Sequence, residues 1–144
     1  MSIKLKLEGF EELLRDIERA GGNVDSATKK CLEKSADIMQ DELKSQMQKS
    51  GVDSSLIDAM PSPTIETDYG RITARVGYKK GAYDPKNPSD GYKVVFLNYG
   101  TPNRKKHGKV KERGFIKRAK NRAGSKIKAQ QEQTLQDILR GLRQ

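Results

Sequence analysis

The residue types that most often carry chemistry are scarce in this chain of 144 residues. It has one cysteine, Cys31, and one histidine, His107, so neither an internal disulfide nor a clustered metal site is expected. His107 lies among lysines and arginines, which disfavour its protonated form. The sequence has no nucleophile-elbow or phosphate-loop motif, and the segment from Asp84 to Gly91 lacks the spacing of a calcium loop. These observations predict a protein that is not an enzyme and that binds no cofactor and no metal.

The remaining chemistry is electrostatic, and it is concentrated in one segment. The formal net charge is +10, but residues 1–103 carry 15 basic and 16 acidic side chains, whereas residues 104–128 carry 12 basic and 1 acidic. Such a cluster can neutralise phosphates, meet an acidic protein surface, or form a solvated arm. No aromatic residue lies between Arg104 and Gly114, so stacking on single-stranded bases is not supported. The cations expected to contact a partner or DNA are Arg104, Lys105, Lys106, Lys109, Lys111, Arg113, Lys117, Arg118, Lys120 and Arg122.

The N-terminal part is predicted to be a helical hairpin over residues 8–49, after a short strand or extended lead-in. Apolar residues recur there every three to four positions, and Gly21-Gly22 separates the two helices. Cys31 falls on the apolar stripe of the second helix, where a small core residue is its simplest role.

Residues 61–101 are predicted to be a β-rich part with a long loop. Residues 64–67 and 71–77 alternate in polarity around a turn at Asp68-Tyr69-Gly70, which is typical of a hairpin. The segment 78–91 has loop composition. Tyr78 and Tyr83 within it, and Tyr92 directly after it, either contact an assembly partner or pack back on the domain. The apolar run 94–97 is expected to be buried, as a strand or as a short helical turn.

A basic connector at 102–114 is predicted to lead into a long C-terminal helix over residues 115–142. The order of elements indicates a single α+β domain spanning residues 1–144, with a helical hairpin, a small antiparallel sheet and a final helix. Hydrophobic and charged residues each make up 33% of the chain, so we expect a thin core that partners complete. The sequence has no long apolar run and no signal-peptide pattern, which favours a soluble protein of the reducing cytosol.

Several short motifs occur together in a recognisable order. They are the run from Leu7 to Leu14, Gly21-Gly22-Asn23-Val24 before a long helix, the hairpin ending at Val76-Gly77-Tyr78, and Phe96-Leu97-Asn98-Tyr99-Gly100-Thr101. Together they resemble the small head-tail joining or tail-completion proteins of long-tailed double-stranded-DNA phages and prophages, relatives of the lambda minor tail protein Z. The chain departs from that family at residues 55–60, which lack a glycine, and at residues 113–119, which lack a proline.

The resemblance implies a structural virion protein that forms a ring in the neck or at the top of the tail and is made in the bacterial host cytoplasm. Its implied partners are tail-terminator and head-closure proteins around the DNA channel, and no catalytic residue carries over. Within the motif, Gly100 is expected to adopt a positive φ and Asn98 to bond to nearby backbone.

The sequence leaves two functions open besides that of a structural phage protein. The first alternative is a stand-alone, sequence-tolerant DNA-binding module that uses residues 104–128. A small nuclease or toxin is a weaker hypothesis, because no acid–base pair is placed for it.

Overall fold

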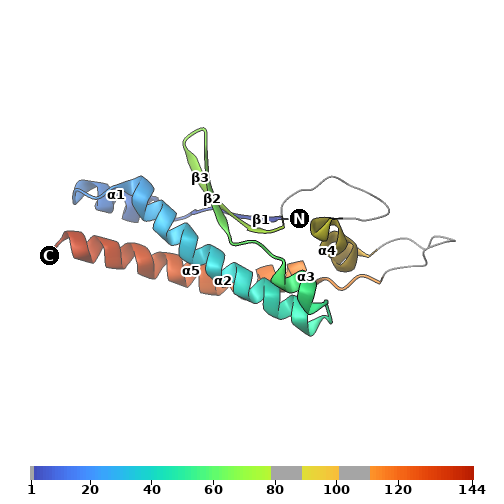
Figure 1. Cartoon of the computed structure of the whole chain (residues 1–144). Helices are drawn as coiled ribbons and strands as arrows, with labels where there is room; N and C mark the ends of the chain where they lie inside the picture. Colours follow the sequence, from blue (N-terminus) through green and yellow to red (C-terminus); the bar gives the residue numbers. More distant parts are fainter. Residues whose placement is uncertain (1, 79–88, 101–110) are drawn as a thin grey trace.

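The computed structural model describes residues 2–78, 89–100 and 111–144. The molecule is elongated: two long helices lie side by side, and a small sheet and a short helix lie along one side of them (Figure 1). This arrangement confirms the predicted α+β class. The elements in chain order are β1 (Ser2–Leu5), α1 (Glu11–Arg19), α2 (Val24–Lys49), α3 (Ser54–Asp58), β2 (Thr64–Asp68), β3 (Arg71–Gly77), α4 (Asp90–Tyr99) and α5 (Phe115–Leu142).

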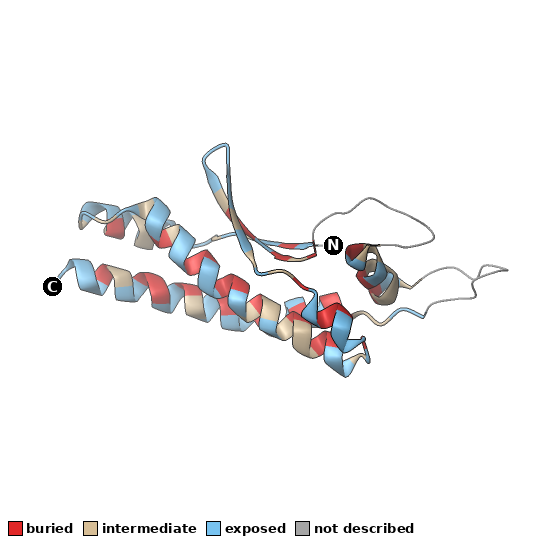
Figure 2. Ribbon diagram, viewed as in Figure 1, coloured by how far each residue is buried: buried red, intermediate tan, exposed pale blue. Residues whose placement is uncertain are grey.

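The pairing of α2 with α5 is the main contact of the fold. The two helices run antiparallel, and buried residues follow the sides that they turn toward each other (Figure 2). Between them lies a small buried polar network: Gln131 Nε2 donates to Ser35 Oγ at 3.1 Å, and Ser35 Oγ donates to the carbonyl of Cys31 at 2.8 Å. Since buried polar groups must be paired, this network favours a single register between the two helices. The predicted core role of Cys31 is confirmed.

The core is divided into two clusters along the long axis. Ile17 of α1 packs with Ala27, Leu135 and Leu139 near the end of the molecule where the chain terminates. Gly22 between α1 and α2 allows this packing, because a Cβ built there would lie 2.7 Å from Ile17 Cγ2 and 3.0 Å from the Ile17 carbonyl oxygen. The larger cluster contains the inner face of the sheet together with the remaining parts of α2 and α5.

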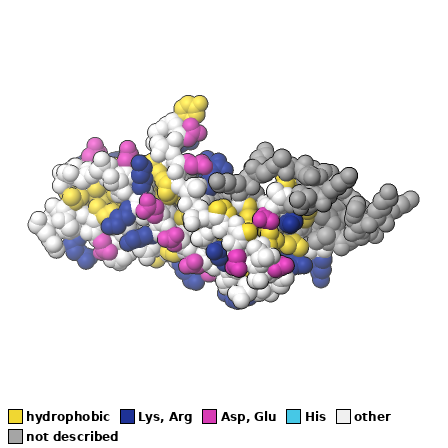
Figure 3. All heavy atoms as spheres, in the orientation of Figure 1, with side chains coloured by type: hydrophobic (Ala, Val, Ile, Leu, Met, Phe, Trp, Pro, Cys, Tyr) yellow, Lys and Arg dark blue, Asp and Glu magenta, His cyan; other side chains and the backbone are white. Residues whose placement is uncertain are grey.

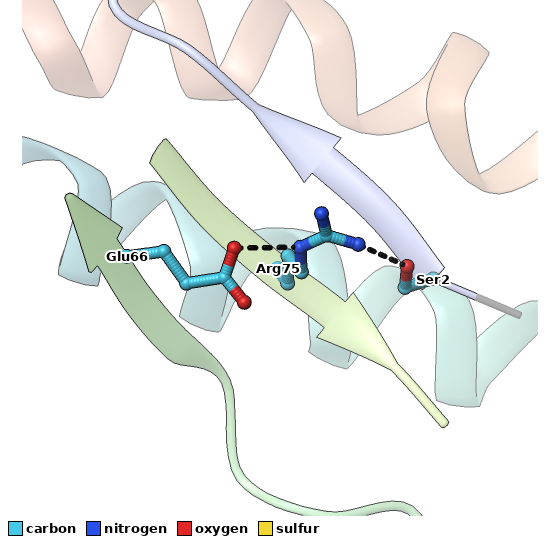
Figure 4. A network of polar contacts seen from close by, with 3 residues as sticks. All are labelled: Ser2, Glu66 and Arg75. Carbon is cyan, nitrogen blue, oxygen red and sulfur yellow. Dashed lines mark hydrogen bonds and ion pairs between the residues drawn. The ribbon is translucent and has the colours of Figure 1, made fainter. Parts of the chain in front are cut away.

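The sheet has the strand order β1-β3-β2, and both pairings are antiparallel. Ile3 and Val76 face each other on the inner surface, which packs against α2. The outer surface is polar: the Nε of Arg75 donates to Glu66 Oε2 at 2.8 Å, and its NH1 donates to Ser2 Oγ at 3.4 Å, so one side chain links three strands (Figure 4). The predicted hairpin is therefore present, with Tyr69 and Gly70 as its two-residue turn.

The region predicted to be β-rich, residues 61–101, contains a helix as well as the hairpin. The apolar run 94–97 lies inside α4, which settles the choice between strand and helical turn. Val94 and Asn98 are the more deeply buried positions in this part of α4, and their four-residue spacing is that of a helix face. The segment 78–91 was predicted to be a loop, but α4 begins at Asp90, so the last two residues of this segment are helical; residues 79–88 lie outside the described residues.

The C-terminal helix has the predicted bounds, 115–142, and continues through Gly124. At the other end of the chain, α1 begins at Glu11, so Glu11 and Glu12 lie in its first turn near the positive end of the helix dipole. No helix in the described part of the chain is both long and apolar enough to cross a membrane.

Candidate basic assembly surface

The start of α5 is held by a residue from another helix. Gly114, at the N-cap position, has a left-handed conformation and no side chain to cap the helix. Asn98 of α4 takes over this role: its Oδ1 accepts from the backbone N–H of Ile116 at 2.9 Å, and its carbonyl accepts from Gly114 N–H at 3.0 Å. The first N–H groups of a helix lack intrahelical partners, so Asn98 satisfies groups that would otherwise be buried and unpaired. The expected bond from Asn98 to backbone is confirmed.

The other described residues of the run 96–101 also have structural roles. Phe96 and Leu97 are partly buried, and Leu97 packs against the larger core cluster. Gly100 follows the end of α4 with φ +77°, which confirms the positive φ expected for it. Its N–H donates to the carbonyl of Phe96 at 2.8 Å. Tyr99 is 64% exposed, and Thr101 lies outside the described residues. The motif therefore ends one helix and starts the next.

Two of the predicted contact cations bond to the C-terminal end of α2. Arg113 NH1 donates to the carbonyl of Ser50 at 3.2 Å, and Arg118 NH2 donates to Ser50 Oγ at 2.6 Å. The Nε of Arg118 also reaches Gln46 Oε1 at 3.4 Å. Cations are favourable at this negative end of a helix dipole. The antiparallel packing thereby offsets the penalty of placing the same cations at the N-terminus of α5.

A third contact between α2 and α5 is the ion pair of Glu42 with Lys126. Lys126 Nζ is 3.4 Å from Glu42 Oε2, and Gln46 Nε2 donates to Glu42 Oε1 at 3.2 Å. The hydrogen bond from Gln46 is the main cause that lowers the pKa of Glu42; Lys126 and Arg122 lower it further. Arg122, one of the predicted contact residues, therefore interacts electrostatically with Glu42 of the same chain.

The remaining described cations point to solvent. Lys111, Lys117 and Lys120 are exposed, and none of them forms an ion pair with a carboxylate in the part of the chain that the structure describes. Lys111 also lines a groove of about 490 Å³ between the end of α2 and the start of α5; its lining residues are Lys49, Ser50, Lys111, Glu112, Arg113 and Arg118. This surface can attract an anionic group. Arg104, Lys105, Lys106 and Lys109 lie outside the described residues.

The described residues offer little chemistry beyond charge. Burial raises the pKa of the Cys31 thiol to about 11, so the thiol stays protonated at neutral pH. Burial, assisted by the nearby carboxylate of Asp90, raises the pKa of Tyr78 to about 12. Over residues 2–78, 89–100 and 111–144, no three His, Cys, Asp or Glu side chains come together as a set that could hold a metal ion.

The tyrosines expected as assembly contacts behave differently from one another. Tyr78 is only 4% exposed, and its hydroxyl donates to the carbonyl of Leu56 at 2.6 Å. Of the two roles expected for Tyr78, the structure shows the second: its ring packs back on the domain as part of the core, and it is not an exposed assembly contact. Tyr92 is half-buried, with its ring 6.4 Å from that of Phe96. Tyr83 lies outside the described residues.

Sequence reasoning missed one exposed aromatic residue. Tyr69 is 98% exposed at the turn between β2 and β3. Its place between Asp68 and Gly70 indicated a turn, and a bulky aromatic in a two-residue turn is the signal that could have drawn attention to it.

Comparison of the chain with models of protein families, with curated proteins and with solved structures found no match.

Proposed function

We propose that the chain is a structural assembly protein of a long-tailed phage or prophage, which joins head to tail through protein–protein contacts in the neck. The observation that carries this proposal is the division of the basic side chains at the start of α5. Arg113 and Arg118 bond to α2, whereas Lys111, Lys117 and Lys120 face solvent with no carboxylate partner among the described residues. The free set supplies a docking surface for an acidic partner, such as a ring of tail-terminator or head-closure subunits.

Two further features support an assembly role. The family motif acts here on the geometry of the docking surface, because Asn98 holds the N-terminus of the helix that carries Lys117 and Lys120. The groove also contains Glu112, whose carboxylate would repel a phosphate but could accept a hydrogen bond from a protein partner.

The proposal is tested by replacing the three free lysines with glutamine in the phage or prophage that encodes the chain. The triple variant K111Q/K117Q/K120Q is expected to leave separate heads and tails, counted by electron microscopy. A matched triple variant at exposed lysines of α2, K29Q/K30Q/K34Q, is expected to yield joined particles. Normal joined and infectious particles in a strain that lacks the whole chain would overturn the proposal.

A stand-alone DNA-binding module is the second candidate, and the 12 basic residues of 104–128 favour it. It makes a different prediction. Affinity for duplex DNA should fall by roughly a decade or more for a few-fold increase in salt, since several phosphate contacts release counterions. A mobility shift that is absent even at low salt would remove this candidate.

A further inference from the structure

Strand β2 forms an open edge of the sheet. The order β1-β3-β2 leaves one side of β2 without a neighbouring strand in the described part of the chain. Its residues are exposed, except for Ile65, which is half-buried. The hairpin that contains β2 stands out from the body of the molecule, with side-chain atoms of hydrophobic type at its tip (Figure 3). The edge is therefore accessible to another molecule.

The turn of the hairpin determines which backbone groups of β2 lie at this edge. Asp68 and Arg71 flank the two-residue turn, and residues in that position form a hydrogen-bonded pair. Such pairs alternate along an antiparallel ladder, so Asp68 and Glu66 direct their N–H and C=O groups to β3. Ile65 and Thr67 direct theirs outward, and no residue that the structure describes bonds to those groups. Each of the two residues thus offers one donor and one acceptor at the spacing of a β-ladder.

The features that normally prevent pairing at a sheet edge are missing from β2. Such edges are usually protected by lysine, proline, a bulge or a free charge. The four-residue β1 carries Lys4, whereas β2 has neither lysine nor proline and pairs in a continuous register. The acidic side chains of β2 are balanced within the hairpin, because Glu66 bonds to Arg75 and Asp68 lies opposite Arg71. Of the two edges, β2 is the one suited to accept another strand.

The two faces of β2 indicate which side chains an added strand would carry. On the inner face, Ile65 packs against the larger core cluster but stays half-buried, so an apolar neighbour would extend this apolar layer. On the outer face, a residue beside the Glu66 carboxylate must be neutral or basic, since like charges in that position are destabilising. Tyr69, 98% exposed directly after β2, offers further apolar area at the end of the strand.

The same charge argument disfavours a second copy of the chain as the occupant. Two β2 strands paired antiparallel over their full length would place Glu66 of one copy opposite Glu66 of the other. A shift by one residue would bring inner positions to the outer face. The chain's own segments 79–88 and 101–110, outside the described residues, both contain proline and several lysines, a composition that disfavours strand pairing.

We propose that β2 binds an extended segment of a different protein, which joins the sheet as a fourth strand through the free backbone groups of Ile65 and Thr67. The segment alternates apolar residues on the inner face with neutral or basic polar residues on the outer face. Main-chain hydrogen bonds supply the affinity in such strand addition, and the alternate side chains supply the specificity. The interaction goes beyond the proposed function and does not depend on it, because it uses a different surface from the lysines near the start of α5.

The test is a titration of the isotope-labelled full chain with a short synthetic peptide, followed by nuclear magnetic resonance. The peptide alternates valine and threonine, has lysine at its centre, and is blocked at both ends. Binding should shift the amide resonances of β2 and slow hydrogen exchange at Ile65 and Thr67 at least about tenfold at saturation. A peptide with glutamate in place of the lysine should bind about two- to fivefold more weakly.

A pair of substitutions at one position separates the backbone from the side chain. Thr67→Pro removes an outward N–H without removing a bond to β3, so it should abolish the peptide-induced shifts. Thr67→Val keeps that N–H and should bind like the wild type. If Thr67→Pro does not fold, the wild-type chain decides the matter with a peptide N-methylated along its pairing edge, which should not bind.

Three results would overturn the inference. They are a wild-type spectrum unchanged at about 5 mM peptide, unchanged binding by a folded Thr67→Pro variant, and unchanged binding of the N-methylated peptide. Protection of Thr67 that rises with protein concentration in the absence of peptide would identify a second copy as the occupant, and so would also contradict the proposal. Each of these results would leave the lysine test of the proposed function unaffected.

Discussion

Asn98 stabilises the start of α5 although it belongs to a different helix. Its side chain accepts from Ile116 N–H, and its carbonyl accepts from Gly114 N–H, at a residue that is only 3% exposed. The motif around Asn98 indicated a bond to backbone, but it could not indicate which backbone. The partner lies beyond the basic connector, so only the tertiary contact between α4 and α5 identifies it.

Replacing Asn98 by alanine should lower the free energy of unfolding by about 1–3 kcal/mol, because a buried N–H loses its acceptor and α5 loses its cap. Chemical denaturation followed by circular dichroism measures the effect. The neighbouring variant Tyr99→Ala removes an exposed side chain and should change stability by no more than about 0.5 kcal/mol. Equal effects of the two substitutions would contradict the capping role.

At the scale of elements, the antiparallel pair α2–α5 determines what the cations do. Both helices could be predicted from their apolar periodicity, including the bounds 115–142. Their pairing could not, since periodicity indicates which face is buried but not what covers it. It is this pairing that brings Arg118 to Ser50 and Lys126 to Glu42.

The Glu42 contacts predict a loss of stability in acid. The pKa of Glu42 is lower in the folded chain than the ordinary 4.5, so its contribution is present above that value and is lost as pH falls through the folded pKa. Glu42→Gln should reduce the dependence of the unfolding free energy on pH between about pH 5 and 3, measured by denaturant titration. Glu33→Gln, at an exposed position of α2, should retain the wild-type dependence. Identical pH profiles for wild type and Glu42→Gln would contradict this role of Glu42.

At the scale of the whole molecule, the core is divided between two clusters along the long axis. Ile17 lies in the cluster near the C-terminus, whereas Val76 lies in the cluster around the sheet. An elongated molecule with separate clusters is expected to open locally at one end before the other.

Ile17→Ala should destabilise the chain by about 2–5 kcal/mol, since it leaves a cavity at a fully buried position. Hydrogen exchange should then accelerate in α1 and in the parts of α2 and α5 near Ala27 and Leu135, with β3 still protected. Val76→Ala should show the reverse pattern. A uniform increase along the chain in both variants would mean that the two clusters open as a single unit.

Local interactions were readable from the sequence, because they depend on residues a few positions apart. The spacing of apolar side chains indicated the helices and the hairpin. The glycine at position 100 predicted the positive φ that the backbone has there. Tertiary structure alone decided the properties that depend on distant residues. It placed Tyr78 in the core, made residues 94–97 helical, and separated the bonded arginines from the free lysines, because burial and pairing arise only when distant segments pack together.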